Sequence, residues 1–375
     1  MFNGSKVIDA DGHVMEPNAL YDEYLEARFR PDLEELKREA AALPSQFFFG
    51  IFHRLNTGRP LGVINPERPL VRSGRRPPGE APDTRGGFDP HVRIKDMARE
   101  GIDIAVLFAT VVSSFCALKT VEFELAMIRA YHRWLKEYCA AYPSRLKGVA
   151  VMPMRAPALA AEEIRRVAKE PWCVGIYLSG HIEDKLLDHP TLHPIWQACQ
   201  DEDLPACFHG GTARPPYGLG TFEMTNNLFL QHSATNPFEM MRAIGALVGG
   251  GVLDLFPRLR VAILEAGVGW LPYWMERLDE HYKLMPEYVP LLKRAPSEAL
   301  RSSQFFISCD PDEETLPYVA SFVGVDHILY ASDYPHFDGR FPDTVRLTAG
   351  RAEFSEADRR KILWDNPRRL YSRIS

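Results

Sequence analysis

The sequence predicts an α/β fold, a single (β/α)8 TIM barrel, and three observations support this prediction. Short apolar runs alternate with helical patterns along the 375 residues, which is typical of βα units and a parallel sheet. There are eight such runs, as a closed barrel requires. None of them leads into a G-x-G-x-x-G motif, so the common dinucleotide-binding alternative is disfavoured.

The predicted strands are four to eight residues long and rich in Val, Ile, Leu or Phe. Such continuous apolar runs are typical of parallel strands that are buried on both faces. In chain order the runs are Lys6–Asp9, Ile102–Phe108, Leu146–Met152, Cys173–Leu178, Pro205–Phe208, Arg260–Leu264, Gln304–Ser308 and His327–Tyr330.

The segments between these runs carry helix signals. Pro157–Lys169 begins with proline and has acidic residues early, which favours a helix start. Ser355–Trp364 begins with a Ser-x-x-Asp pattern that is similar to a capping box. The remaining predicted helices are Val121–Ala141, His193–Asp203, Pro237–Phe256 and Asp312–Val323.

The chain is longer than the roughly 250 residues of a plain barrel, and two segments do not fit the repeat. One is an insertion of about residues 20–90 between the first two strands, partly helical within Asn18–Leu43. The other is Tyr273–Arg301 after the sixth strand. We expect one domain over residues 1–375, with both segments shaping the barrel mouth. For residues 75–90 a mobile surface loop is an equal alternative.

Composition and charge exclude several functional classes. Hydrophobic residues make up 46%, charged residues 25%, and the net charge is −6, so nothing favours nucleic acid or an anionic membrane as a partner. No apolar stretch approaches the ~20 residues that span a bilayer, and the N-terminus lacks the apolar run of a signal peptide. We therefore expect a cytoplasmic protein. The six scattered cysteines form no C-x-x-C pair, which indicates free buried thiols.

Polar side chains occur where the predicted strands end. Asp11 and His13 follow the first strand, two residues apart, so an extended chain places them on the same face. His209, Glu265 and Asp333 follow the fifth, sixth and eighth strands. Because the active site of a barrel lies at the C-terminal ends of its strands, these side chains converge on one mouth.

Mixed His and carboxylate donors suit a divalent metal ion. Zn²⁺ is the first expectation, with Fe²⁺ and Mn²⁺ as alternatives, and a catalytic site keeps an open position. Each residue alone is a weak signal, since a single His after a strand is more often hydrogen-bonded in the core and a single Asp more often caps a helix.

Several longer stretches match a known family in chain order. They are Ile8–Pro17, Met97–Asp103, Leu204–Gly211, Phe256–Arg260 and Ala331–Pro335. On these stretches the chain resembles the amidohydrolase superfamily, in the branch that includes aminocarboxymuconate-semialdehyde decarboxylase and γ-resorcylate decarboxylase. The resemblance implies a (β/α)8 barrel with a metal at the strand C-termini, and a homodimer or larger assembly.

The resemblance also implies ligand positions. Asp11, His13, His209 and Asp333 match the family's metal ligands, with Asp11 in place of the first His of the common H-x-H pair. Asp333 matches the aspartate that binds the metal and handles the proton of an attacking water.

The chain departs from the decarboxylases at two places. They have a proton-handling His after the sixth strand, whereas this chain has Glu265. Glu265 is a candidate general acid or base, or a ligand for a second metal, and the alternative is a hydrogen-bonding role only. The fourth strand ends in Ser179, Gly180 and His181, with no Lys or Glu to bridge two metals, so the number of ions, one or two, stays open.

Four further residues are candidates with a structural alternative for each. His181 is a pocket residue or a surface His, and His232 is a catalytic candidate or a cap of the following helix. His336 is a substrate contact, a partner that orients a ligand, or a rim residue. Trp270 is a substrate wall or part of the core.

The first functional expectation is hydrolysis. A metal lowers the pKa of bound water to about 7, Asp333 takes its proton, and Glu265 assists. The bond would be an amide, ester, thioester or C–C bond next to a carbonyl, in a small aromatic or apolar carboxylic-acid-type metabolite. The alternative is non-oxidative decarboxylation of an aromatic or dienoic acid, against which the missing His counts. A non-catalytic binding barrel is the third hypothesis.

Overall fold

Eight parallel strands form the centre of the molecule, and each pairs with the next along the chain. The computed structural model describes residues 4–17, 19–42, 84–110, 120–209, 228–336 and 339–374. The strands are β1 Ile8–His13, β2 Ile104–Phe108, β3 Leu146–Val151, β4 Cys173–Leu178, β5 Ala206–His209, β6 Val261–Leu264, β7 Phe305–Cys309 and β8 Ile328–Tyr330. The predicted (β/α)8 barrel is thus confirmed.

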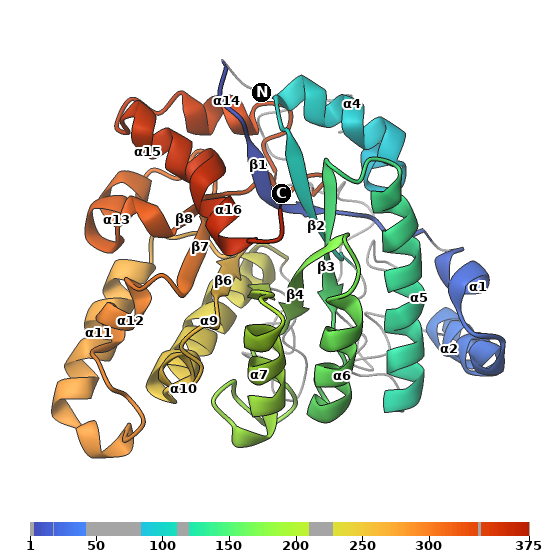
Figure 1. The fold of residues 1–375 in the computed structure, drawn as a ribbon, viewed down its shortest axis with the longest axis horizontal. Helices are drawn as coiled ribbons and strands as arrows, with labels where there is room; N and C mark the ends of the chain where they lie inside the picture. The colour runs from blue at the N-terminus through green and yellow to red at the C-terminus, as the bar shows by residue number, and fades with distance from the viewer. Residues whose placement is uncertain are drawn as a thin grey trace.

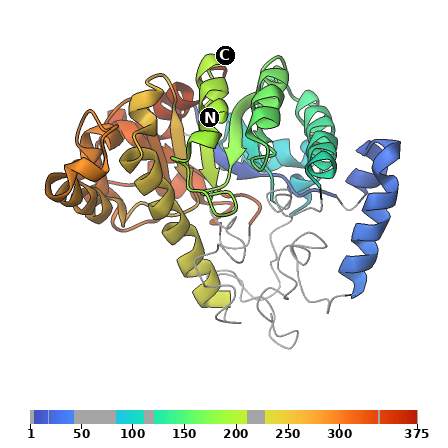
Figure 2. The ribbon, with the colours of Figure 1, turned by 90° about the horizontal axis from the view of Figure 1, so that it is seen from below.

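Helices surround the strands (Figure 1). They are α1 Leu20–Tyr24, α2 Arg30–Ala42, α4 Pro90–Glu100, α5 Val121–Ala140, α6 Pro157–Val167, α7 His193–Asp201, α9 Leu228–Gly249, α10 Val252–Leu255, α11 Leu271–Leu284, α12 Pro296–Leu300, α13 Leu316–Val323, α14 Thr344–Ala349, α15 Glu356–Arg360 and α16 Asn366–Leu370. Figure 2 shows that α9, in yellow, and α2, in blue, both extend beyond the strands on the same side.

Most predicted helices begin close to their expected residues, because their start signals are local. Ser355 caps α15 by accepting a hydrogen bond from the Asp358 N–H at 3.1 Å. The prediction for α9 was wrong at its start, since the helix begins at Leu228 and contains Pro237 in its interior. Proline lacks the N–H that would bond the carbonyl four residues earlier, so that turn lacks one helical hydrogen bond.

The barrel interior is filled by apolar side chains and by one tyrosine from the C-terminal segment. Every residue of β2 is buried, as a strand covered on both faces requires. Tyr371 is fully buried, and its hydroxyl donates to the Ala10 carbonyl of β1 at 2.8 Å. A Cβ on Gly175 of β4 would lie 3.3 Å from the Tyr371 ring. Tyr371 therefore fills space between β1 and β4.

Backbone hydrogen bonds close the barrel between β1 and the segment that follows β8. The Asp333 N–H donates to the Asp11 carbonyl at 3.0 Å, and the His13 N–H donates to the Tyr334 carbonyl at 2.6 Å. The buried Asp9 carboxylate accepts from the Ser332 N–H at 2.9 Å and from the Ser332 hydroxyl at 2.5 Å. These contacts, here called the β1–β8 seam, hold Asp11, His13 and Asp333 close together.

Arg93 of α4 supports this seam from outside. Its side chain is buried, donates to the His13 carbonyl at 2.7 Å and lies 3.9 Å from Asp9 Oδ2. The guanidinium also lies over the Tyr334 ring, 4.6 Å from its centroid. Burial raises the pKa of the Asp9 carboxyl, and the Arg93 charge opposes that rise.

The two segments outside the repeat are partly described. Helices α1 and α2 confirm the expected helical character within Asn18–Leu43. Most of α11, which begins at Leu271, and all of α12 lie within Tyr273–Arg301. Residues 43–83 lie outside the described residues, as does most of 75–90. That 1–375 forms one domain stays a prediction.

The cysteines behave as expected where they are described. Cys139, Cys173, Cys199, Cys207 and Cys309 are buried and free, and Cys116 lies outside the described residues. Among the described helices, none is long and apolar enough to cross a membrane.

Replacing Arg93 with methionine should destabilise the protein, because it leaves the Asp9 carboxylate buried without its cationic neighbour. We expect Arg93→Met to lower the free energy of unfolding by about 3–5 kcal/mol in urea denaturation. The control is Arg28→Met, since the Arg28 side chain is 72% exposed and its replacement should change stability by less than about 0.5 kcal/mol. Equal stabilities of the two variants would contradict a supporting role for Arg93.

Candidate metal centre

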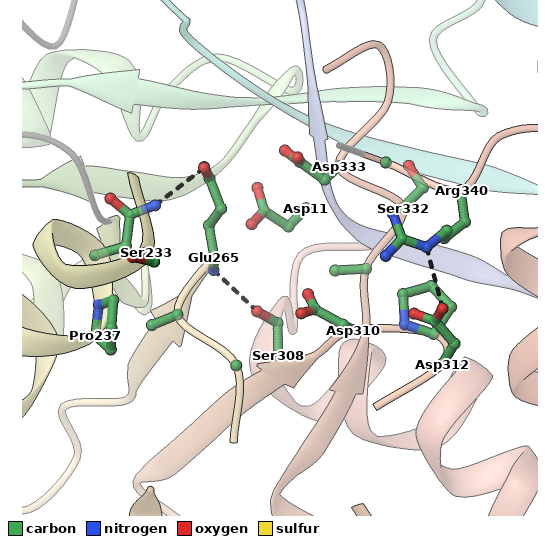
Figure 3. Close-up of a pocket in the computed structure, with 16 residues that line it drawn as sticks. Asp11, Ser233, Pro237, Glu265, Ser308, Asp310, Asp312, Ser332, Asp333 and Arg340 are labelled. Atoms are coloured by element: carbon green, nitrogen blue, oxygen red, sulfur yellow. Dashed lines mark hydrogen bonds and ion pairs between the residues drawn. The ribbon is translucent and has the colours of Figure 1, made fainter. Parts of the chain in front are cut away.

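Five side chains from four strand ends meet at the barrel mouth. Asp11 and His13 lie in the C-terminal half of β1, His209 ends β5, Glu265 directly follows β6, and Asp333 lies three residues after the end of β8. The strands are parallel, so their C-terminal ends lie at one rim. Figure 3 shows the carboxylates of Asp11, Glu265 and Asp333 directed toward a common point.

The inner part of this cluster consists of Asp11, His13 and His209, all buried. The two histidine Nε2 atoms are 3.0 Å apart, and Asp11 Oδ1 lies 3.5 Å from that of His13 and 3.6 Å from that of His209. Asp11 Oδ1 has no hydrogen-bond partner within the part of the chain that the structure describes. A buried oxygen of this kind facing two imidazole nitrogens fits a metal ion as the shared partner.

The charges of the inner cluster also fit a cation. Burial, together with the neighbouring His336 and His209 charges, lowers the pKa of His13 to about 3, although Asp11 opposes this shift. Burial acts in the same direction on His209, but the Asp11 and Glu265 carboxylates outweigh it and raise the pKa of His209 to about 10. The histidine charges hold the pKa of Asp11 below its usual range, although burial alone would raise it. The arrangement therefore favours one positive charge within the cluster, which a metal ion can supply.

Glu265 and Asp333 border the inner cluster on the cavity side. Glu265 Oε2 lies 3.1 Å from His209 Nε2, and Asp333 Oδ1 lies 3.4 Å from His13 Nε2. Both side chains are 19% exposed, so they face the cavity and not the core. The candidate donors thus form two adjoining groups that share His13: Asp11, His13 and His209 inside, and His13, Glu265, Asp333 and His336 on the cavity side.

Glu265 and Asp333 share an unusual backbone conformation. Their φ angles are +49° and +52°, in the left-handed region that side-chain-bearing residues rarely adopt. Such a conformation costs about 1 kcal/mol or more and persists where the surroundings impose it, often at functional sites. Here it turns each side chain into the mouth immediately after its strand.

Two contacts orient the ligand candidates. His13 Nδ1 lies 3.2 Å from the Ala109 carbonyl, which favours a proton on Nδ1 and leaves Nε2 to face the cluster. His336 Nδ1 lies 2.7 Å from Asp333 Oδ1, and its Nε2 lies 3.1 Å from the Thr110 hydroxyl. His336 thus fits the expected orienting partner, and a substrate contact by this residue stays a prediction.

The other candidate residues have different surroundings. His181 Nδ1 accepts from Arg242 at 2.9 Å, and Trp270 donates to the Ala266 carbonyl at 2.8 Å. Neither lines the described cavity at the mouth. His232 belongs to α9, but its side chain lies outside the described residues. Their proposed roles stay predictions.

The structure adds three residues that the sequence did not single out. Asn236 of α9 donates to Glu265 Oε1 at 3.1 Å, Ser308 accepts from the Glu265 N–H at 3.2 Å, and Thr110 contacts His336. Ser308 and Thr110 lie at the C-terminal ends of β7 and β2, so the strand-end signal could have found them. Asn236 lies within a helix and carries no such signal.

A cavity of about 290 Å³ opens beside the cluster. One wall is the metal cluster, and the opposite wall carries Asp310 and the ion pair of Arg340 with Asp312 at 3.1 Å (Figure 3). This size suits a small metabolite. Its lining residues are Asp11, Ser233, Asn236, Pro237, Glu265, Ala266, Gly267, Ser308, Asp310, Pro311, Asp312, Ala331, Ser332, Asp333, Gly339 and Arg340.

The fold and this cluster define a (β/α)8 barrel with a candidate catalytic site at the C-terminal ends of its strands. A family model described as Amidohydrolase matches residues 8–373. The chain therefore belongs to the amidohydrolase family and is an enzyme of that superfamily, which confirms the resemblance seen in the sequence.

Three known proteins illustrate the relationship. The 2-amino-3-carboxymuconate-6-semialdehyde decarboxylase of Dictyostelium discoideum is 24% identical over 74% of this chain and 75% of its own length. The γ-resorcylate decarboxylase of Polaromonas sp. strain JS666 is 29% identical over 65% of this chain and 75% of its own length. A crystal structure of the dihydroxybenzoic acid decarboxylase from Polaromonas sp. JS666, with manganese and 2-nitroresorcinol, matches with a TM-score of 0.67 at 22% identity, covering 98% of this chain and 97% of that one. This structural likeness shows the shared fold.

Removing one imidazole should remove the metal. We expect His209→Asn to reduce the divalent ion that copurifies from about one per chain to less than a tenth, because a buried nitrogen donor is lost. Elemental analysis of the purified proteins measures this. His281→Asn, on the partly exposed surface of α11, serves as the control and should match the wild type. Unchanged metal content in His209→Asn would contradict the site.

The positive φ of Asp333 predicts that a glycine variant at this position is more stable than an alanine variant, the reverse of the usual order within a helix. Both Asp333→Gly and Asp333→Ala lose the carboxylate, but only glycine adopts this φ without strain, so the glycine variant should be more stable by about 1 kcal/mol. The control pair is Glu280→Gly and Glu280→Ala in α11, where alanine should be more stable by about the same amount. Urea denaturation measures both differences, and an alanine variant that is the more stable at position 333 would exclude the strain.

Proposed function

We propose that this protein is a metal-dependent non-oxidative decarboxylase of a small aromatic acid. The observation that carries the proposal is the geometry of the mouth, where one compact set of metal donors and one additional acidic side chain, Glu265, face the same cavity. Decarboxylation needs these two components, a cation beside the substrate carboxylate and a group that protonates the carbon. The curated relatives are named decarboxylases, which supports this alternative over our first expectation of hydrolysis.

Asp11, His13, His209 and Asp333 are the residues that would hold the metal ion. When bound, a divalent metal ion neutralises carboxylate charge and orients a substrate carboxylate and an adjacent oxygen. Zn²⁺ prefers four ligands, whereas carboxylate-rich sets with more donors suit Mn²⁺. The two imidazoles and two carboxylates of these residues leave room for the two substrate oxygens, and the resulting set of six donors supports Mn²⁺, the ion bound in the related dihydroxybenzoic acid decarboxylase, over Zn²⁺.

Each side chain then has a defined task. Glu265 delivers a proton from Oε2, the oxygen on the cluster side, to the substrate carbon that loses its carboxylate. Asp333 is held by His336 at 2.7 Å through Oδ1, the oxygen that also lies 3.4 Å from His13 Nε2. The wall formed by Asp310, Asp312 and Arg340 contacts the far edge of the substrate. Glu265 therefore replaces the histidine that the decarboxylases have after the sixth strand.

Hydrolysis is the second candidate, and one observation favours it. Three carboxylates surround the proposed cation, so an anionic substrate carboxylate enters an already negative site. A neutral ester or lactone carbonyl does not meet this repulsion. In that case Asp333 would take the proton of the attacking water and Glu265 would assist.

Assembly and location are further parts of the proposal: the family resemblance suggests the assembly, and the sequence suggests the location. We expect a small-molecule substrate, a homodimer or larger homo-oligomer, a cytoplasmic location, and neither nucleic acid nor membrane as a partner. The net charge of −6 is consistent with the last two expectations.

Assays of carbon dioxide release and of ester hydrolysis distinguish the two candidate reactions. With 2,6-dihydroxybenzoate and Mn²⁺ we expect release of carbon dioxide, and Glu265→Gln should lower kcat by about 10²–10⁴-fold, because glutamine cannot transfer a proton. Asp333→Asn should lower it comparably. Hydrolysis is tested in parallel with a panel of phenyl esters and lactones, by measuring the acid that is released from each. Turnover of the panel without carbon dioxide release from aromatic acids would reject decarboxylation. Glu280→Gln, on the exposed face of α11, is the control and should keep full activity.

A further inference from the structure

Helix α9 places one amide directly against the catalytic carboxylate. Asn236 is buried at 8% exposure and lines the cavity beside the cluster. Its Nδ2 donates to Glu265 Oε1 at 3.1 Å. Neither the strand-end pattern nor the metal-ligand set includes this residue.

The contacts distinguish the two oxygens of Glu265. Oε1 accepts from Asn236, whereas Oε2 lies 3.1 Å from His209 Nε2 and 3.9 Å from His13 Nε2. The Glu265 N–H donates to Ser308 Oγ at 3.2 Å, so the backbone is anchored as well. Rotation of the carboxylate is therefore restricted, and the oxygen that faces the metal position is always Oε2.

We propose that Asn236 is a positioning residue that reserves Glu265 Oε2 for the metal centre and the reacting carbon. The NH2 group of an amide only donates hydrogen bonds, so the oxygen it contacts must accept. Oε2 is consequently the oxygen left for the cluster. It faces the cation when Glu265 is ionised and carries the proton when Glu265 acts as the acid, and it does not do both at once. The acid role rests on the decarboxylation proposed above.

The proton transfer balances with Glu265 and water alone. The bond between the ring carbon and the carboxylate carbon breaks, carbon dioxide leaves, and the electron pair remains on the ring carbon. The proton on Oε2 then forms the new C–H bond, and Glu265 regains a proton from water. Asn236 is unchanged throughout and acts only by holding Oε1.

Residues of α9 other than Asn236 hold this helix against the barrel. Glu239, one turn further along the same helix and fully buried, accepts from the Gly180 N–H at 3.2 Å at the end of β4. Met240 and Ala243 of α9 are also fully buried. Because these residues fix the helix, a substitution at Asn236 should leave the helix in place and disturb Glu265 selectively.

A double-mutant cycle with Mn²⁺ alone as the probe tests this role without a substrate. We expect Asn236→Leu and the isosteric Asn236→Asp to weaken Mn²⁺ binding about tenfold or more in calorimetric titration, because Oε2 is no longer held toward the cation. In a Glu265→Gln background the same substitutions should change the Kd by less than about twofold, since their effect passes through the carboxylate. Gln197→Leu removes a comparable amide-to-carboxylate hydrogen bond, 2.8 Å to Asp201 on the exposed face of α7, so it is the matched control and should bind as the wild type does.

The outcomes separate the two proposals. An unchanged Kd in both Asn236 variants, or an equal loss with and without Glu265, would overturn the positioning role. Thermal unfolding of each variant checks that the fold is retained, and the isosteric aspartate variant supplies the comparison if the leucine variant does not fold. Wild-type protein that binds no Mn²⁺ would reject the metal centre itself. A tenfold loss of Mn²⁺ affinity that disappears in the Glu265→Gln background, together with no decarboxylation of aromatic acids, would retain the positioning role and reject only the proposed reaction.

Discussion

Closure of the barrel at the β1–β8 seam is the constraint on which the site depends. Three of the five cluster residues, Asp11, His13 and Asp333, lie in the two segments that this seam joins by backbone hydrogen bonds. The seam is itself held by the buried carboxylate of Asp9, which satisfies both the amide and the hydroxyl of Ser332. A polar contact of this kind is directional, so it sets the register of the seam as well as its strength.

When no cation is bound, the groups of the cluster repel one another. Two imidazole nitrogens 3.0 Å apart cannot both carry a proton, and the neighbouring carboxylates repel each other. Glu265 and Asp333 additionally hold left-handed backbone conformations. The remaining fold, with its filled interior and continuous β ladder, stabilises this unfavourable arrangement. Such a balance is common where geometry serves function more than stability.

Glu265 is one of the positions at which this chain departs from the pattern that the family resemblance implies, which has a histidine after the sixth strand. A carboxyl group and an imidazole both transfer protons, but the carboxyl has two equivalent oxygens and needs a partner that makes them different. Asn236 on one side and His209 on the other supply that difference. The exchange of histidine for glutamate therefore changes the charge of the site and transfers part of its organisation to α9, a helix that does not belong to the cluster of strand ends.

The sequence by itself determined the barrel and the strand-end residues, because both depend on local patterns. Apolar runs of buried strands and the polar residues that end them are visible one segment at a time, and all eight strands and the convergence of Asp11, His13, His209, Glu265 and Asp333 followed from them. Only the tertiary structure decided which atoms meet. The extent of α9 around Pro237, the contact of Asn236 with Glu265, and the position of His181 away from the cavity depend on packing between segments distant in the chain, which no local pattern encodes.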